Sequence, residues 1–257
     1  MALDFTLAAF EDFCQWLTHM PVFTVGDYLA RSQPPPTPFV ILRIDVDYRE
    51  TTAVHMARMA ERHNLEASFY FRHREGAFDL DAMKAIARLN HEVGYHFETL
   101  DTCQGDFQAA ADLFLEHVTL LRESGLIIRT VAGHGAPPVA VNYRSNLDLL
   151  IHTPGLCERA NLLGESTLSI DFSRVAYISD AGWRWRRYNY YRPGVVGKPT
   201  SLHATIRDLP RRDAGLYINF HPHQWFAHPA TMLYYRVRNR LGTLILPHVR
   251  RGSLPKT

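Results

Sequence analysis

From residue 39 onward, short and largely apolar runs alternate with longer segments in which apolar residues recur every three or four positions. Such runs are typical of buried strands, and a recurrence near every 3.6 positions is typical of amphipathic helices. The predicted strands cover residues 39–44, 67–71, 92–97 and 127–132, and the predicted helices lie near residues 50–63, 79–90 and 106–124. Because helices of this length connect neighbouring parallel strands by right-handed crossovers, the alternation predicts an α/β fold with a parallel sheet.

The same pattern divides the chain into three parts. Apolar residues at helical spacing open the chain and a Pro-rich connector follows them, so residues 1–37 are predicted to form an N-terminal helical extension. Residues 38–230 are predicted to form one α/β barrel, whose less regular second half adds strands at 175–179 and 216–220. Residues 231–257 are predicted to form a basic C-terminal helix and tail. A chain of 257 residues has the ordinary size of a single barrel.

Side chains that can bind a metal or move a proton follow the predicted strands. Asp45 and Asp47 end the first strand, and because they are two residues apart they lie on the same face. Two adjacent carboxylates repel each other unless a proton or a cation lies between them. In parallel α/β folds, functional side chains collect at the carboxyl ends of the strands. The candidates in this chain are Asp45, Asp47, His96, Glu98, Asp101, His134, Asp180, His221 and His223.

Imidazole and carboxylate groups in one place are what a hydrolytic metal centre requires. A divalent metal held by three protein groups keeps a position open for water, lowers the pKa of that water and polarises a carbonyl group. A further carboxylate can accept the proton of the water, and a further imidazole can protonate the leaving group. These residue types therefore predict metal-dependent hydrolysis.

Five segments carry a more specific pattern. They are Arg43-Ile-Asp-Val-Asp-Tyr48, Glu92-Val-Gly-Tyr-His-Phe-Glu98, His134-Gly-Ala-Pro137, residues 177–185 and residues 219–225. In order and spacing they resemble the motifs of the polysaccharide deacetylase family, which is carbohydrate esterase family 4. The resemblance extends over about residues 38–228 and is greatest to the bacterial branch encoded among surface-polysaccharide genes. It implies a distorted (β/α)7 barrel and the metal-dependent removal of an acyl group, usually N-acetyl, from a sugar.

The resemblance also implies a role for individual residues. Its first motif makes Asp45 the general base and Asp47 a metal ligand. Its second motif makes His96 a metal ligand. Its last motif makes His221 the general acid, and Asp180 falls where the family has a carboxylate that orients this acid.

One position departs from the family pattern. The family has a second metal-binding His four residues after the first, and this chain has Leu100 there. His134, Glu98 and Asp101 are the candidate substitutes. His134 is favoured because imidazole is a good ligand for zinc-like ions and because it ends the adjacent predicted strand. The expected cofactor is therefore a divalent metal, zinc by preference, bound by Asp47, His96 and His134.

A segment rich in aromatic residues and arginine, residues 183–192, contains no acidic residue. Aromatic rings stack on sugars and guanidinium groups bind phosphate, so this segment is predicted to form a rim that binds a glycan or sugar phosphate. Trp185 and Arg186 are the expected substrate-binding residues of the segment, and Trp225 of the last motif is expected to shape the same wall. The alternatives are a hairpin whose tryptophans pack in the core and, with less support, a platform for nucleic acid bases.

Charge and cysteine content narrow the class of protein. The formal net charge is +2, and the three cysteines are far apart, which argues against a disulfide scaffold and a Cys-rich zinc site. The start of the chain lacks the features of a signal peptide, and no run approaches the ~20 apolar residues that cross a bilayer, so a cytoplasmic protein is expected. No Asp or Glu follows Asp213, and the basic residues that do follow are Arg236, Arg238, Arg240, Arg250, Arg251 and Lys256. This end of the chain predicts either contact with phosphate or an anionic membrane surface, or a solvated helix face with a frayed terminus.

Together these observations predict a hydrolase that removes an acetyl-like N-acyl group from an amino sugar in surface polysaccharide or lipopolysaccharide (O-antigen) biosynthesis. The expected partner is an amino-sugar, nucleotide-sugar or lipid-linked glycan substrate, with no nucleic acid. The alternative is a non-catalytic carbohydrate-binding protein of the same fold whose metal site has decayed at Leu100. A metal-free hydrolase or a phosphate-ester hydrolase on this fold has less support, and the sequence leaves the oligomeric state open.

Overall fold

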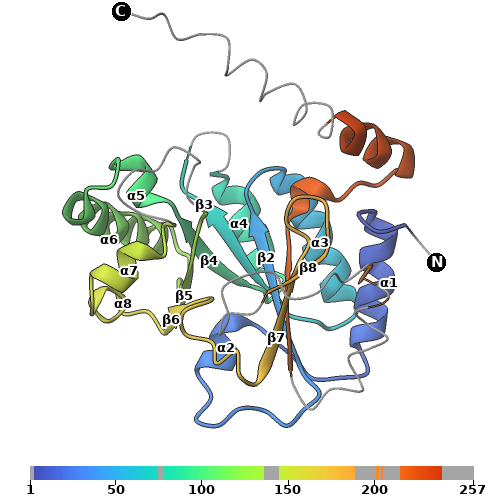
Figure 1. Cartoon of the computed structure of the whole chain (residues 1–257), viewed down its shortest axis with the longest axis horizontal. Helices are drawn as coiled ribbons and strands as arrows, with labels where there is room; N and C mark the ends of the chain where they lie inside the picture. Colours follow the sequence, from blue (N-terminus) through green and yellow to red (C-terminus); the bar gives the residue numbers. More distant parts are fainter. Residues whose placement is uncertain are drawn as a thin grey trace, which may run out of the picture.

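Seven parallel strands form the centre of the sheet within the part of the chain that the structure describes (Figure 1). The structure is a computed structural model, and it describes residues 3–74, 78–135, 145–188, 201–202, 204 and 215–238. The seven strands lie in the order β6-β5-β4-β3-β2-β9-β7, β8 continues antiparallel to β7, and β1 pairs with the start of β2. The strands are β1 (Val22–Phe23), β2 (Val40–Val46), β3 (Ser68–Arg72), β4 (Glu92–Phe97), β5 (Thr130–Gly133), β6 (Gly164–Glu165), β7 (Val175–Ser179), β8 (Arg186–Tyr188) and β9 (Gly215–Phe220).

Helices connect the strands, and several of them begin at a capping side chain. Thr6, Asp79 and Asp106 each accept a hydrogen bond from a backbone N–H in the first turn of the helix that follows. Such caps satisfy N–H groups that have no partner within the helix. The helices are α1 (Leu7–Leu17), α2 (Val25–Leu29), α3 (Glu50–Arg62), α4 (Leu80–Ala87), α5 (Thr99–Thr102), α6 (Phe107–Glu123), α7 (Asp148–His152) and α8 (Leu156–Arg159), and the 3-10 helix η2 covers Pro222–Gln224.

The two faces of the sheet bury different side chains. All seven residues of β2 are buried, as expected for a parallel strand covered on both faces. Its even-numbered residues, from Val40 to Val46, pack in a large core with side chains of α1, α3, α4 and α6. The odd-numbered positions start with Ile41, which belongs to a smaller core built largely from aromatic rings. They continue with Arg43 and Asp45, so the second face becomes polar toward the carboxyl end of the strand.

The sheet curls around this smaller core and forms a half-barrel. Strands β6 and β8 lie at its two edges, and therefore the barrel is open within the described residues. The arrangement confirms the predicted α/β fold and is consistent with a distorted (β/α)7 barrel.

The predicted elements agree closely with the structure where their pattern is long. The six predicted strands correspond to β2, β3, β4, β5, β7 and β9, and the three long predicted helices correspond to α3, α4 and α6. The sequence did not indicate β1, β6 or β8, because strands of two or three residues are too short to show a period. Helix α1 packs its Phe10 and Phe13 rings on Phe220 of β9, so the N-terminal helix shares the core of the barrel.

Candidate metal centre

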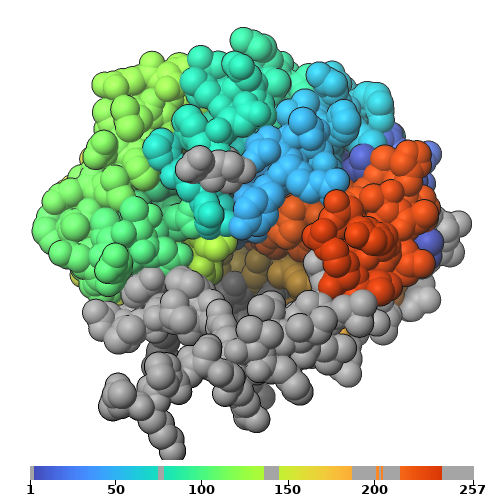
Figure 2. Space-filling model, turned by 90° about the horizontal axis from the view of Figure 1, so that it is seen from above, coloured from blue at the N-terminus to red at the C-terminus, as the bar shows by residue number. Residues whose placement is uncertain are grey.

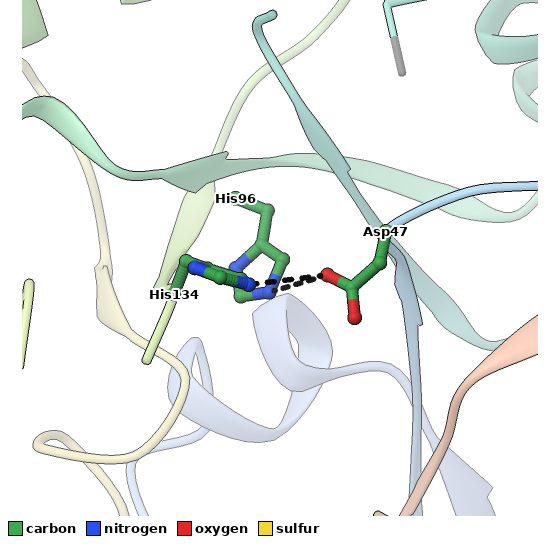
Figure 3. Close-up of side chains that lie close together, drawn as sticks. All are labelled: Asp47, His96 and His134. Atoms are coloured by element: carbon green, nitrogen blue, oxygen red, sulfur yellow. Dashed lines mark ion pairs between the residues drawn. The ribbon is translucent and has the colours of Figure 1, made fainter. Parts of the chain in front are cut away.

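The candidate residues meet at the carboxyl end of the sheet. Asp45 and Asp47 lie at the end of β2 and His96 near the end of β4, whereas His134 and His221 directly follow β5 and β9. Figure 3 shows the Asp47 carboxylate pointing toward the rings of His96 and His134, which come from two other strands. The predicted common face of Asp45 and Asp47 is confirmed, since each has a carboxylate oxygen within 4 Å of the same His96 nitrogen.

His96 is held in the orientation and tautomer that a metal ligand needs. Its Nδ1 lies 2.9 Å from the carbonyl oxygen of Ala132 on β5, and only an Nδ1–H can donate to a carbonyl. The lone pair of a neutral imidazole is then on Nε2, which lies 3.6 Å from Oδ1 of Asp47. A second hydrogen bond of this kind is the usual way in which proteins orient a ligating His. The ring is buried, with 3% of its residue surface exposed.

Asp47 and His134 complete a group of three. Oδ1 of Asp47 is buried and has no hydrogen-bond partner among the described residues. It lies 3.7 Å from Nε2 of His134 and faces Nε2 of His96 at a similar distance. One ligand atom from each of the three residues lies within 4.8 Å of the other two. A buried carboxylate oxygen without a partner is costly, and a cation would remove that cost, so the group fits a divalent metal.

The electrostatics of the group favour the same conclusion. Burial lowers the pKa of His134 to about 4, helped by the nearby charge of His96, so this ring is neutral and has a lone pair at neutral pH. Burial acts to raise the pKa of Asp47, but the positive charges of His96 and His221 outweigh it and lower that pKa. One carboxylate and two imidazoles suit zinc and related ions.

The structure separates the three candidates for the missing ligand. Glu98 is engaged by Arg72, whose Nε lies 3.2 Å from Oε1 and whose Nη2 donates to Oε2. Its carboxylate is therefore already neutralised by a guanidinium. Among the described residues, Asp101 groups with Glu98 and His134 and shares no group with Asp47. His134 is the substitute that faces both Asp47 and His96, and its role as third ligand remains a prediction. Leu100 is fully buried in the core.

Asp45 lies beside this group and is held by three hydrogen bonds. Arg43 donates from Nε to Oδ1 at 2.7 Å and from Nη2 to Oδ2 at 2.8 Å, and Asn219 donates to Oδ2 at 2.8 Å. Burial acts to raise the pKa of Asp45, but the Arg43 guanidinium, followed by His96 and His221, lowers it far below its ordinary value. Asp45 is therefore a carboxylate at any physiological pH, and its oxygens are directed by the two donors.

Sequence reasoning missed Arg43 and Asn219 as parts of the site. The signal for Arg43 was present, because residues two apart on a strand share a face and Arg43 precedes Asp45 by two. Asn219 could not be found this way, since it is opposite Arg43 in the β2–β9 register and the sequence does not show which strands pair.

His221 and Asp180 form a second ion pair across the site from His134. His221 Nδ1 lies 2.6 Å from Oδ1 of Asp180, and its Nε2 lies 3.8 Å from Oδ2 of Asp45. Burial acts to lower the pKa of His221, but the charge and hydrogen bond of Asp180 outweigh it and raise the pKa to about 9. His221 is therefore an imidazolium at neutral pH, with its Nε2–H directed toward the site.

Trp225 supports this pair and offers no surface to a substrate. Its side chain is fully buried, and its Nε1 donates to Oδ2 of Asp180 at 2.6 Å. This corrects the expectation that Trp225 contacts a substrate: the indole positions Asp180 instead. Trp185 requires the same correction, because it is 5% exposed and donates from Nε1 to Asp4 at 3.1 Å. Both rings pack around Phe220, so the core-packed alternative describes them better than a glycan rim.

The rest of the predicted rim is described only in part. Arg186 is partly exposed, and its contact with a substrate stays a prediction. Trp183 stacks on Phe226, with ring centroids 5.6 Å apart. Residues 189–192 of the rim and residues 239–257 of the basic tail lie outside the described residues.

Two further side chains line the site beside Asp47. His223 places its unpartnered Nδ1 3.9 Å from Oδ2 of Asp47, on the side away from His96 and His134. Tyr48 is 46% exposed, and its ring contacts His223 edge-on and Arg72 through its face. The sequence indicated His223 as a candidate without a role, and Tyr48 is an aromatic side chain that reaches solvent beside it.

No family model and no curated protein matches the chain. Among solved structures, one that is similar to this chain is wild-type BA3943, a CE4 family pseudoenzyme from Bacillus anthracis. The similarity covers 85% of this chain and 63% of the BA3943 chain, with 16% sequence identity and a TM-score of 0.41. A mutant of BA3943, described as a CE4 family pseudoenzyme with restored enzymatic activity, is similar over 85% of this chain and 65% of its own, with 15% identity and the same TM-score. The chain thus spans less than two thirds of the length of these structures.

No helix among the described residues is both long enough and apolar enough to cross a membrane.

Proposed function

We propose that this protein is a metal-dependent hydrolase that removes an N-acyl group from an amino sugar. One observation carries the proposal: the buried, unpartnered Oδ1 of Asp47 faces Nε2 of both His96 and His134. Asp45 and His221 lie next to this group and supply a carboxylate and an imidazolium. The motifs that resemble polysaccharide deacetylases contain these same residues, with His134 in place of the second His of the family pattern.

Asp47, His96 and His134 would hold the metal. When bound, a divalent cation supplies Lewis acidity, which polarises a carbonyl oxygen and acidifies water. Asp45 contributes a proton acceptor, because Arg43 and Asn219 keep it ionised and direct its oxygens toward the site. The low pKa of Asp45 makes it a weak base, so it would depend on the acidity that a bound metal lends to water.

His221 contributes the proton that an amine leaving group needs. An expelled nitrogen leaves far more readily when it is protonated, and the raised pKa of about 9 keeps His221 protonated at neutral pH. Asp180 holds the ring through Nδ1, so that the proton on Nε2 faces the substrate. This pairing of roles favours hydrolysis of an amide over hydrolysis of an ester, whose alkoxide leaves more easily. An amino sugar of a surface polysaccharide, nucleotide-linked or lipid-linked, is the substrate that the resemblance suggests.

A second function is a carbohydrate-binding protein without catalysis. The observation that favours it is the environment of Asp45, which already accepts three hydrogen bonds and is a weaker base for that reason. Under this alternative the site binds a sugar through the same groups but does not release its acyl group.

The test measures metal content and acyl release on the same preparations. The parent protein, loaded with zinc and dialysed, is expected to hold one equivalent and to release acetate from N-acetylated amino-sugar oligomers. Asp47→Asn and His96→Gln are expected to lose both properties. Asp112→Asn and His55→Gln, which change exposed residues of the same types, serve as matched controls and should keep both.

The outcomes separate the proposal from its alternative. Asp45→Asn and His221→Ala should keep the zinc but lose roughly 10²–10⁴-fold in turnover. A parent that holds zinc and binds oligomers without acyl release supports the binding protein. A parent whose zinc content equals that of the Asp47→Asn variant contradicts the metal centre itself.

A further inference from the structure

The helix over residues 229–238 is the last element that the structure describes, and its outward face is apolar. Met232 is 4% exposed, and Tyr235 stacks on Phe226 with centroids 5.0 Å apart, so these two residues form the inward face. Leu233, Tyr234 and Val237 point outward and are 58%, 62% and 48% exposed. An ordinary surface helix is polar on its outward face, and this one is not.

The apolar stripe is bordered by arginines that other side chains hold in place. The guanidinium of Arg238 lies 4.6 Å from the centre of the Tyr235 ring, and that of Arg236 lies 5.6 Å from the centre of the Phe5 ring. Arg49 of the loop before α3 lies over Phe226 at 4.3 Å and adds a third positive charge. The C-terminal part of the chain offers no compensating acid, since residues 214–257 contain six Arg or Lys and no Asp or Glu.

The helix lies at the same end of the molecule as the candidate metal centre. It follows η2, which directly continues from His221, and in Figure 1 it lies in red above α1 and α3. Figure 2 shows the orange-to-red residues of this region on the face seen from above, beside the blue residues of the α3 region. A partner that covers this stripe would therefore also lie next to the candidate site.

We propose that the stripe of Leu233, Tyr234 and Val237 docks on a bilayer surface that contains anionic lipids. Apolar side chains on one helix face with arginines beside them are the composition of helices that lie in a membrane interface. The apolar side chains enter the boundary between headgroups and acyl chains, and the arginines attract negatively charged headgroups. The proposal does not depend on the chemistry of the metal centre.

A second copy of the chain is a poorer occupant of the stripe. A two-fold contact brings the same patch of both copies together, so arginines would face arginines, and the helix itself has no acidic residue to place between them. Like charges across an interface oppose association, whereas anionic headgroups neutralise them.

The experiment is co-sedimentation of the full chain with vesicles of phosphatidylcholine, with and without phosphatidylserine. The parent should bind the anionic vesicles at least about tenfold more tightly than the neutral ones, and added salt should weaken the binding. The double variant Leu233→Ser/Val237→Ser should lose at least about tenfold in affinity for the anionic vesicles. Ile127→Ser/Ile151→Ser removes two side chains that are 80% and 53% exposed elsewhere, and it should bind like the parent.

Several results would overturn the proposal. They are no binding by the parent, equal binding to both kinds of vesicle, and unchanged binding by the Leu233→Ser/Val237→Ser variant. A parent that is dimeric by light scattering and a double variant that is monomeric would assign the stripe to a second copy instead. If circular dichroism shows that the double variant does not fold, the single variant Tyr234→Asn replaces it, with a smaller expected loss and the same interpretation.

Discussion

Replacing His221 by Gln should change how the stability of the metal-free protein depends on pH. His221 is 13% exposed as a side chain and forms its shortest contact, 2.6 Å, with Asp180. Gln keeps the ring's approximate length and polarity but cannot bind a proton. Comparison of parent and variant therefore isolates what proton binding at His221 contributes to the free energy of unfolding.

The magnitude follows from the pKa of His221. Burial disfavours the charged ring, but Asp180, Asp45 and Asp47 favour it and raise the pKa from 6.5 to about 9. At about 1.4 kcal/mol for each unit, the folded state binds this proton more tightly than the unfolded chain by roughly 3 kcal/mol. Because the folded pKa is the higher one, this stabilisation is fully present below about pH 6.5 and is lost as the pH rises through about 9.

The assay is urea denaturation of both proteins, stripped of metal by a chelator, at about pH 6 and about pH 10. The free energy of unfolding of the parent, minus that of His221→Gln, should fall by roughly 3 kcal/mol between these two pH values. Titration of the labelled imidazole by NMR should place its pKa far above that of an exposed His.

A control with the opposite sign guards against a general effect of pH. Burial, with a contribution from His73, lowers the pKa of His117 to about 4, so the folded state disfavours its proton. The free energy of unfolding of the parent, minus that of His117→Gln, should therefore rise by up to about 1 kcal/mol between about pH 6 and about pH 10. Two results would refute the assignment of a protonated His221. One is a difference in unfolding free energy between parent and His221→Gln that changes by less than about 1 kcal/mol between the two pH values. The other is an NMR pKa of His221 at or below the ordinary value.

Four other substitutions test three separate parts of the site. Loss of a group that only supports a metal ligand typically weakens metal binding by roughly 10–100-fold. His134→Ala should weaken zinc binding by more than this range, whereas Glu98→Gln should weaken it by less. Competition with a chromophoric chelator measures both zinc affinities, and equal losses would contradict the choice of His134. Arg43→Met leaves the Asp45 carboxylate buried without its cation and should lower the free energy of unfolding at neutral pH by roughly 3–5 kcal/mol. Urea denaturation measures that loss, and a stable variant would show that the ion pair is dispensable. Trp225→Phe keeps an aromatic ring but removes the N–H donor to the buried carboxylate after β7, at an expected cost of roughly 1–3 kcal/mol. Calorimetry checks this value, and an unchanged melting temperature would argue against the hydrogen bond.

The sequence by itself determined the order of the elements and the end of the sheet at which chemistry gathers. The apolar runs of β2, β3, β4 and β9 are long enough to show buried strands, and the amphipathic segments between them show the crossover helices. Once strands are parallel, their carboxyl ends lie at one edge, so the residues that follow them must be neighbours. For this reason Asp47, His96 and His134 could be expected to lie close together, whereas their choice as ligands came from the resemblance to polysaccharide deacetylases and from Leu100.

The sequence could not determine which polar groups neutralise one another. Arg72 forms an ion pair with Glu98, and Arg43 forms one with Asp45. The first pair makes Glu98 unavailable as a metal ligand, and the second keeps Asp45 ionised. They depend on side-chain directions and on the register between strands, such as Arg72 opposite His96. A linear pattern carries the period of a strand but not its partner.

Burial was likewise decided only by the tertiary structure. Trp185 and Trp225 have the composition of a sugar-binding wall, yet both are enclosed by Phe220 and its neighbours and direct their N–H groups inward. Leu233 and Val237 have the composition of a core, yet both point to solvent. An aromatic or aliphatic side chain gains the same free energy from any apolar surroundings, so its type alone does not show whether the chain's own core or an external partner provides them.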